Sequence, residues 1–145
     1  MAIKVAINGY GRIGRCILRA LYESSRTNEI QIVAINDIGT DIGIHALLTQ
    51  HDSVHGRLNN KVEKIQDGIR IGDHEIKFFS QRDPNLLPWA NLGVDVVLEC
   101  TGIFTSKVKA SAHLNAGAKK VIISAPAKTE DVKTIVLGVN DHLLN

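Results

Sequence analysis

The sequence predicts one α/β domain built on a mostly parallel β-sheet, and three observations carry this prediction. Short apolar runs that suit buried parallel strands alternate with segments whose apolar residues recur at helical spacing. The length of 145 residues is close to the commonest domain size, and no repeat, low-complexity tract or linker divides the chain. Hydrophobic residues make up 44% and charged residues 22% of the chain, which is ordinary for a soluble globular domain.

The first half of the chain predicts a strand, a helix, a strand and a second helix. The run IKVAING starts at Ile3, ends in Asn-Gly, and is typical of a buried strand. A second buried strand is predicted over Ile30–Asp37, and a short helix over Ile42–His51. Between the strands, Arg12–Glu23 predicts a helix with one apolar face. The residues expected on that face are Ile13, Cys16, Ile17, Ala20 and Leu21.

The second half predicts a small antiparallel meander and then a return to alternating strands and helices. The stretch KVEKIQDGIRIGDHEIKFF alternates around two expected turns, Asp67-Gly68 and Gly72-Asp73, and DPNLLPW is typical of a turn. The stretch SKVKASAHLNAG predicts a helix whose end is marked by a glycine. The remaining strands are expected over Val94–Gly102, Lys119–Pro126 and Lys133–Asn140.

Three glycines join the first strand to the first helix with the spacing G-x-G-x-x-G. Gly9 suits the tight turn, Gly11 lets a pyrophosphate approach the backbone, and Gly14 lets the helix pack closely on the strand. Free N–H groups at the helix start favour phosphate. Asp37 lies 23 residues past Gly14, where a carboxylate accepts hydrogen bonds from adenosine ribose hydroxyls and repels a 2′-phosphate. The motif in this context predicts a doubly wound, Rossmann-type domain that binds NAD rather than NADP, against the alternative of a mononucleotide-binding or ligand-free α/β domain.

Composition and residue spacing indicate no other kind of site. The net charge of +2 has no basic stripe behind it, and no apolar run is long enough to span a bilayer, so neither nucleic acid nor a membrane is expected as a partner. The N-terminus lacks a signal-peptide layout, which predicts a cytoplasmic protein with reduced, buried cysteines at Cys16 and Cys100. His51 and His55 lack the glutamate and the helix of a zinc protease, so we predict no metal site. Neither cysteine has a histidine partner at a recognisable position, so we predict no catalytic residue.

Several strings of the sequence resemble those of glyceraldehyde-3-phosphate dehydrogenases. They cover essentially the whole chain in the family's order: VAINGYGRIGR, AINDI, HDSVHGR, RDPNLLPW, LECTGIFTSK, AGAKKVIISAPAK and GVN. The chain therefore resembles the NAD-binding half of that enzyme. The strings TGIFTSKVKASAH and ISAPAK favour it over the related erythrose-4-phosphate dehydrogenase. The resemblance implies a cytoplasmic, homotetrameric oxidoreductase of glycolysis that oxidises an aldehyde through an acyl-cysteine, with hydride transfer to NAD and release by phosphate.

The resemblance also implies cofactor-binding roles for residues on the pyrophosphate and adenosine side of the cofactor. The backbone N–H groups of Arg12 and Ile13 are expected to hold the pyrophosphate. Asn36 and Asp37 are expected at the adenosine side, and Arg82 near the adenine.

Four residues of the second half are implied to follow the cofactor across the sheet edge. Thr101, Gly102 and Phe104 come after a strand's carboxyl end, and Ser124 closes the next strand near the nicotinamide half. Ligands of open α/β sheets do bind beyond the carboxyl ends of strands. The residues themselves also allow a turn role for Thr101 and a core role for Phe104.

The chain departs from the family in one respect. The family's nucleophilic cysteine stands in an S-C-T-T-N motif, and this sequence contains no such motif. The catalytic histidine, the substrate phosphate-binding residues and the second domain are missing too, so glyceraldehyde 3-phosphate and phosphate would bind only through the missing domain. We therefore expect residues 1–145 to be an NAD-binding domain without dehydrogenase activity of its own. A fragment of erythrose-4-phosphate dehydrogenase and a stand-alone, non-catalytic nucleotide-binding module remain as alternatives.

Overall fold

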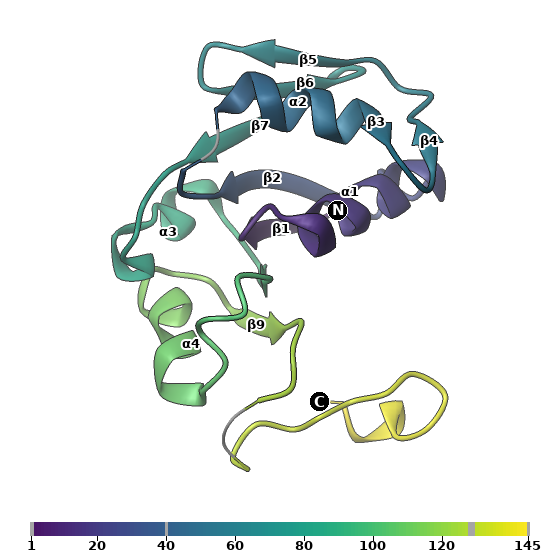
Figure 1. The fold of residues 1–145 in the computed structure, drawn as a ribbon. Helices are drawn as coiled ribbons and strands as arrows, with labels where there is room; N and C mark the ends of the chain where they lie inside the picture. Colours follow the sequence, from purple (N-terminus) through teal and green to yellow (C-terminus); the bar gives the residue numbers. More distant parts are fainter. Residues whose placement is uncertain (1, 40, 128–129, 145) are drawn as a thin grey trace.

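A computed structural model describes residues 2–39, 41–127 and 130–144 and has a seven-stranded sheet at its centre (Figure 1). Helices and strands alternate in the first and last thirds of the chain, with a meander between them. In chain order the elements are β1 (Ile3–Asn8), α1 (Arg12–Glu23), β2 (Ile30–Asn36), α2 (Ile42–Gln50), β3 (His51–Asp52), β4 (Gly56–Arg57), β5 (Val62–Ile65), β6 (Gly68–Ile71), β7 (His74–Phe79), η1 (Pro84–Leu86), α3 (Trp89–Leu92), β8 (Val96–Glu99), α4 (Lys107–Asn115), β9 (Lys120–Ile123) and η2 (Asp141–Leu143).

The strand order of the sheet confirms the predicted fold class. The order is β5-β6-β7-β2-β1-β8-β9. The five strands from β7 to β9 pair in parallel, whereas β6 pairs antiparallel with both β5 and β7. From β1 the chain builds outward through β2 on one side, and it later returns to add β8 and β9 on the other. The order therefore reverses between β1 and β8, which is the switch point where ligands of doubly wound sheets bind.

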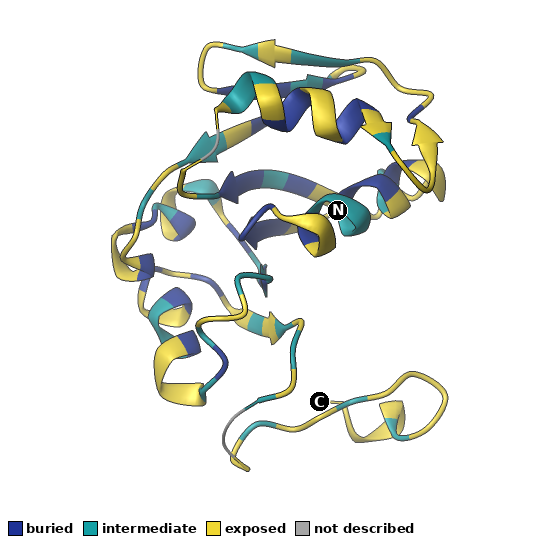
Figure 2. Ribbon diagram, in the orientation of Figure 1, coloured by how far each residue is buried: buried dark blue, intermediate teal, exposed yellow. Residues whose placement is uncertain are grey.

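Two hydrophobic cores lie on opposite faces of the sheet, because successive strand residues point to opposite sides. Ile7 of β1 is fully buried in one core, with Leu18 of α1 and Ala46 of α2. Its neighbour Ala6 is fully buried in the other core, with Trp89 of α3 and Val97 of β8. Figure 2 shows the buried positions along the central strands. Helices therefore cover both faces, as a doubly wound fold requires.

The bounds of α1 agree with the prediction, but its buried face coincides only in part with the predicted apolar face: Leu21 packs against the core, while Cys16 and Ile17 are half-buried. The residues that α1 buries are Gly14, Leu18, Arg19 and Tyr22, whereas Ile13 is 53% exposed. The close contact of Gly14 with the first strand sets the rotation of the helix. The Arg19 guanidinium can be buried because it donates to backbone carbonyls, including Thr49 at 2.7 Å and Gly56 at 2.9 Å. Apolar spacing alone does not detect a glycine contact or a buried arginine whose terminal nitrogens donate to backbone carbonyls.

The meander is confirmed, but its first turn falls one residue earlier than predicted. The turn is Gln66-Asp67, and Gly68 already belongs to β6, opposite Ile65 of β5. Gly68 is needed in the strand because a Cβ at this position would collide with the carbonyl oxygen of Ile76. The second turn, Gly72-Asp73, is where the sequence predicts it.

The prediction of a strand over Lys133–Asn140 is wrong. This segment has no sheet partner and lies away from the sheet as an extended turn (Figures 1 and 2), with Leu137 88% exposed. The Asn140 side chain bonds to the backbone of this segment instead: its Oδ1 accepts from the Val136 N–H at 2.6 Å, and its Nδ2 donates to the Thr134 carbonyl at 2.8 Å. An apolar run becomes a strand only where a neighbouring strand edge pairs with it.

The other predicted elements are present with small shifts at their ends. The strands expected over Val94–Gly102 and Lys119–Pro126 are shorter, as β8 and β9. The predicted helix of the last third is α4, which Ser106 caps by accepting from the Lys109 N–H at 3.2 Å.

Candidate functional site

A hollow lies at the carboxyl ends of β1, β2 and β8, over the switch point of the sheet. We call it the carboxyl-end hollow. The residues that line it are Asn8, Gly9, Gly11, Asn36, Asp37, Ile38, Gln81, Arg82, Cys100, Thr101, Ile103 and Phe104. Seven of the residues expected to bind the cofactor are among them: Gly9, Gly11, Asn36, Asp37, Arg82, Thr101 and Phe104.

The three glycines of the turn occupy different steric environments. Gly9 has a φ of +91°, and a Cβ there would lie 2.7 Å from the Thr101 nitrogen, so the turn packs directly on the end of β8. A Cβ on Gly14 would lie 2.5 Å from the Gly9 carbonyl oxygen, so α1 closes tightly on the same turn. A Cβ on Gly11 would meet no atom within 4 Å. Gly11 therefore leaves free space at the wall of the hollow, and a side chain would project into it.

The start of α1 leaves donors beside this space. Gly11 is the N-cap residue and provides no side-chain cap, and the first turn carries no acidic residue. The leading N–H groups of a helix have no intrahelical partner and attract anions. Arg12 and Ile13 begin the helix, so their N–H groups are among these donors.

The Arg12 side chain points to another part of the molecule. Its guanidinium forms an ion pair with Asp52 of β3. The Asp52 carboxylate also accepts from the N–H groups of His55 and Val54, each at 2.8 Å. The His55 and Val54 N–H bonds and the Arg12 guanidinium outweigh the opposing effect of burial and hold the pKa of Asp52 well below its usual range. Arg12 therefore has its backbone N–H available for a ligand while its side chain ties α1 to β3.

Asp37 follows β2 directly, and donors from two elements hold its carboxylate. Oδ1 accepts from the Tyr10 N–H in the glycine turn at 3.0 Å. Oδ2 lies 3.0 Å from Nε2 of His45 on α2. The Asp37 side chain is 19% exposed, so it reaches the hollow without leaving its partners.

A buried polar network lies below the hollow and joins the ends of the three strands. Asn36 donates to Asn8 Oδ1 at 2.7 Å and to the Gln81 carbonyl at 2.9 Å, and it accepts from the Gln81 N–H at 2.8 Å. Asn8 in turn donates to Glu99 Oε2 at 2.7 Å. The Asn36 amide is thus used inside the protein, where it holds the segment that carries Arg82.

Glu99 is the centre of this network and is a fully buried carboxylate. Oε1 accepts from the Thr101 N–H at 3.0 Å and from the Thr101 hydroxyl. Oε2 accepts from Asn8 and lies 2.6 Å from Nε2 of His113 on α4. Burial opposes ionisation of Glu99, but the hydrogen bonds from His113, Asn8 and Thr101 outweigh it and hold the pKa below its ordinary value.

Trp89 fixes the protonation of His113. The indole N–H can only donate, and it lies 3.0 Å from Nδ1 of His113, so Nδ1 is the acceptor. The proton of the neutral imidazole is then on Nε2, which donates to Glu99. The buried carboxylate is therefore held by neutral donors.

Several predicted residues do not line the carboxyl-end hollow. Arg12, Ile13 and Gly14 are in the helix behind it, and Gly102 and Ser124 lie beside it. Ser124 donates its backbone N–H to the Glu99 carbonyl at 3.0 Å, so it follows β9 next to the end of β8. The roles assigned to these positions stay predictions.

The expectation that both cysteines are buried is wrong, because Cys16 and Cys100 are each half-buried. Cys100 lies just past the end of β8 and lines the hollow. Burial raises the pKa of its thiol and the Glu99 carboxylate adds to this, against a hydrogen bond with Ser124. The thiol is therefore not activated as a nucleophile.

Other features of the site were not predicted from the sequence. Asn8 and Glu99 share a signal, since each is a polar residue in the last position of a mostly apolar strand. His45, Gln81 and His113 carry no such signal, because only the tertiary fold brings them to the strand ends.

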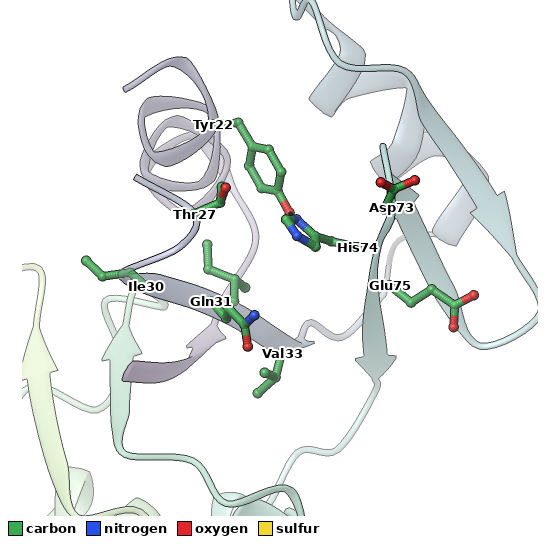
Figure 3. A pocket seen from close by; sticks show the side chains of 9 residues that line it. Tyr22, Thr27, Ile30, Gln31, Val33, Asp73, His74 and Glu75 are labelled. Carbon is green, nitrogen blue, oxygen red and sulfur yellow. Dashed lines mark hydrogen bonds between the residues drawn. The ribbon is translucent and has the colours of Figure 1, made fainter. Parts of the chain in front are cut away.

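A second hollow lies at the other end of β2, and we call it the amino-end hollow (Figure 3). It exists because β2 pairs with β7 only from Ala34 onward, so that the first half of β2 and the start of β7 diverge. The Tyr22 hydroxyl and His74 Nδ1, 3.1 Å apart, bridge the gap. Its lining consists of Tyr22, Thr27, Ile30, Gln31, Ile32, Val33, Asp73, His74 and Glu75.

The described residues offer neither a metal site nor a membrane-spanning helix. In residues 2–39, 41–127 and 130–144, no three His, Cys, Asp or Glu side chains gather closely enough to hold a metal ion. Within the same ranges no helix has both the length and the apolar character needed to cross a bilayer.

Comparison with known proteins matches this architecture to one family. The family model for the glyceraldehyde 3-phosphate dehydrogenase NAD binding domain matches residues 3–107. A chromosomal glyceraldehyde-3-phosphate dehydrogenase of Cupriavidus necator is 58% identical over 144 residues, which are 99% of this chain and 43% of that protein. A glyceraldehyde-3-phosphate dehydrogenase of Pseudomonas aeruginosa is 52% identical over 144 residues, 42% of its length. The chain thus spans less than half the length of these relatives.

Proposed function

The chain belongs to the family of glyceraldehyde 3-phosphate dehydrogenase NAD-binding domains, and from this premise we propose that it binds NAD in the carboxyl-end hollow. One arrangement carries the proposal: the start of α1, the free space at Gly11 and the Asp37 carboxylate all meet at one hollow over the switch point. A phosphate-binding helix start next to a ribose-binding carboxylate is what a dinucleotide requires.

Each part of the hollow suits one part of the dinucleotide. The free space at Gly11 fits the pyrophosphate, which the N–H groups of Arg12 and Ile13 would hold. Asp37 would accept from the adenosine ribose hydroxyls, and Arg82 would lie near the adenine. Asn36 would act through Gln81, by holding the segment before Arg82.

The other wall of the hollow suits the nicotinamide half. Thr101 and Phe104 line this wall, and Gly102 and Ser124 flank it. Glu99 would keep Thr101 in place through the bonds to its N–H and hydroxyl. Bound NAD supplies the hydride acceptor, and the chain's own contribution is to bind and orient it.

We further propose that residues 1–145 form the cofactor-binding domain of a phosphorylating, cytoplasmic and homotetrameric glyceraldehyde-3-phosphate dehydrogenase of glycolysis. The identity with relatives of that name over 99% of the chain supports this. Cys100 has a raised thiol pKa beside a buried carboxylate, and no histidine base accompanies either cysteine within the described ranges. The 145-residue chain alone should therefore form no NADH from glyceraldehyde 3-phosphate, NAD and phosphate.

Calorimetric titration of the chain with NAD tests the proposal, with Gly11→Val as the critical variant. A Cβ at this position would meet no protein atom within 4 Å, so we expect the fold and its thermal midpoint to stay unchanged in this variant. Its side chain takes the space of the pyrophosphate, so the affinity for NAD should fall at least about tenfold. Thr27→Val, in the amino-end hollow, is the matched control and should bind NAD like the unmodified chain.

Two results would contradict the proposal. One is the absence of heat at millimolar NAD in a sample that circular dichroism shows to be folded. The other is a Gly11→Val variant with the affinity of the unmodified chain.

A further inference from the structure

His45 is a buried histidine, and within the described part of the chain its imidazole forms one hydrogen bond, with the proposed ribose-binding carboxylate. Its side chain is 3% exposed and comes from α2, whereas Asp37 follows β2. Nε2 lies 3.0 Å from Asp37 Oδ2. The ring packs edge-on against Tyr10, with centroids 5.3 Å apart, and tilted against Phe78 at 5.4 Å. Ring packing therefore fixes the direction in which Nε2 points.

The surroundings of the ring also fix where its proton lies. A carboxylate only accepts, so the proton must be on Nε2. Nδ1 is buried and has no hydrogen-bond partner among the residues that the structure describes. A charged imidazolium would leave a buried N–H unpaired at Nδ1. Burial lowers the pKa of His45 and Arg15 adds to this, while Asp37 and Asp41 oppose it. His45 is thus a neutral donor that leaves the charge of Asp37 intact.

The carboxylate is oriented from two sides. The Tyr10 N–H holds Oδ1 to the glycine turn, and His45 holds Oδ2 to α2. Each carboxylate oxygen has a second lone pair, so both can still accept from a ribose hydroxyl. A fixed, fully charged carboxylate binds two ribose hydroxyls and repels a 2′-phosphate better than a freely rotating one.

We propose that His45 is the positioning residue that orients Asp37 and thereby sets the affinity for the adenosine ribose and the preference for NAD over NADP. This inference rests on the proposed function, because it assumes that Asp37 meets the ribose. His45 acts through Asp37 and does not itself line the hollow.

A double-mutant cycle of His45→Phe and Asp37→Ala tests the inference in the 145-residue chain. Phenylalanine keeps the ring packing and removes only the donor. His45→Phe should lower the affinity for NAD about fivefold to tenfold, the effect of one hydrogen bond to a charged group, and should narrow the ratio of NAD to NADP affinity. In the Asp37→Ala background the same substitution should change the affinity by less than about twofold, because the two residues act as a unit.

Two control variants separate positioning from a general loss of structure. His45→Gln retains an N–H that can donate to Asp37 and should recover part of the NAD affinity. His74→Phe removes a histidine that bonds to the Tyr22 hydroxyl in the amino-end hollow, and it should leave NAD binding unchanged.

A measurement on the unmodified chain keeps the inference testable if His45→Phe does not fold. Nitrogen-15 spectra of the imidazoles should show the Nε2–H tautomer of His45 at neutral pH. The Nδ1–H tautomer or an imidazolium would overturn the inference, as would equal effects of His45→Phe with and without the Asp37 carboxylate. Failure of the unmodified chain to bind NAD would instead overturn the proposed function, and this inference with it.

Discussion

The two hollows of this molecule lie at opposite ends of β2, and they differ in how their polar groups are arranged. At the carboxyl end, a helix start, an oriented carboxylate and a buried network converge on the space. At the amino end, the space results from the divergence of β2 and β7, and its acidic side chains do not converge (Figure 3). Glu75 there pairs with Arg70 at 3.0 Å instead of facing a ligand.

This comparison teaches that free space alone does not define a binding site. In the carboxyl-end hollow the groups facing a ligand are held by other groups behind them. Asp37 is held by Tyr10 and His45, and Thr101 is held by Glu99. The amino-end hollow has a bridge from Tyr22 to His74, and the start of α1 is not part of its lining. Preorganised polar groups are what give a site its affinity and specificity.

The largest expected effect comes from removing the centre of the buried network. Glu99→Ala leaves donors of Asn8, Thr101 and His113 without an acceptor, and it opens a cavity among these three residues. We expect it to lower the free energy of unfolding by about 3–5 kcal/mol. Tyr22→Phe breaks the bridge of the amino-end hollow and should cost only about 1 kcal/mol. Urea unfolding of both variants measures the difference, and equal losses would contradict the comparison.

The same carboxylate should make stability sensitive to acid. The pKa of Glu99 is lower in the folded chain than its ordinary value of 4.5. Its contribution is therefore fully present above the unfolded-state pKa and is lost as the pH falls through the lower folded-state pKa. Unfolding curves of the unmodified chain and of Glu99→Gln should converge as the pH falls below about 4.5. A constant difference between them from pH 7 to pH 3 would show that Glu99 is not ionised in the fold.

A smaller effect is expected from the carboxylate that faces the ligand. Asp37→Ala should reduce the ratio of NAD to NADP affinity about tenfold, or about 1.4 kcal/mol, because it removes both the ribose acceptor and the repulsion of a 2′-phosphate. Calorimetry with both cofactors measures this ratio. Asp73→Ala, at the rim of the amino-end hollow, is the matched control. An unchanged ratio in Asp37→Ala would show that this carboxylate is not at the ribose.

The sequence predicts the residues that line the carboxyl-end hollow better than the residues behind them that hold them in place. Gly9, Gly11 and Asp37 carry signals because backbone geometry and a strand end restrict which residues fit there. His45 and His113 reach the strand ends from helices, and no spacing in the chain reports that contact.

The predictions that are wrong have physical causes in tertiary packing. The rotation of α1 depends on a glycine contact, and the first turn of the meander depends on a backbone collision at Gly68. A strand over Lys133–Asn140 would need a neighbouring strand to pair with, and this segment pairs with no strand of the sheet. Local sequence patterns predict helices and strands, but they do not predict the tertiary contacts that set the rotation, the ends and the pairing of these elements.

The central claim is that NAD binds at the carboxyl end of β2 and not at the amino end. Amide nitrogen-15 spectra recorded during a titration with NAD test it most directly. We predict the largest shifts at the N–H groups of Arg12, Ile13 and Thr101, with Val33 and His74 unmoved. Shifts centred on Val33 and His74, with the helix start of α1 unmoved, would contradict the account.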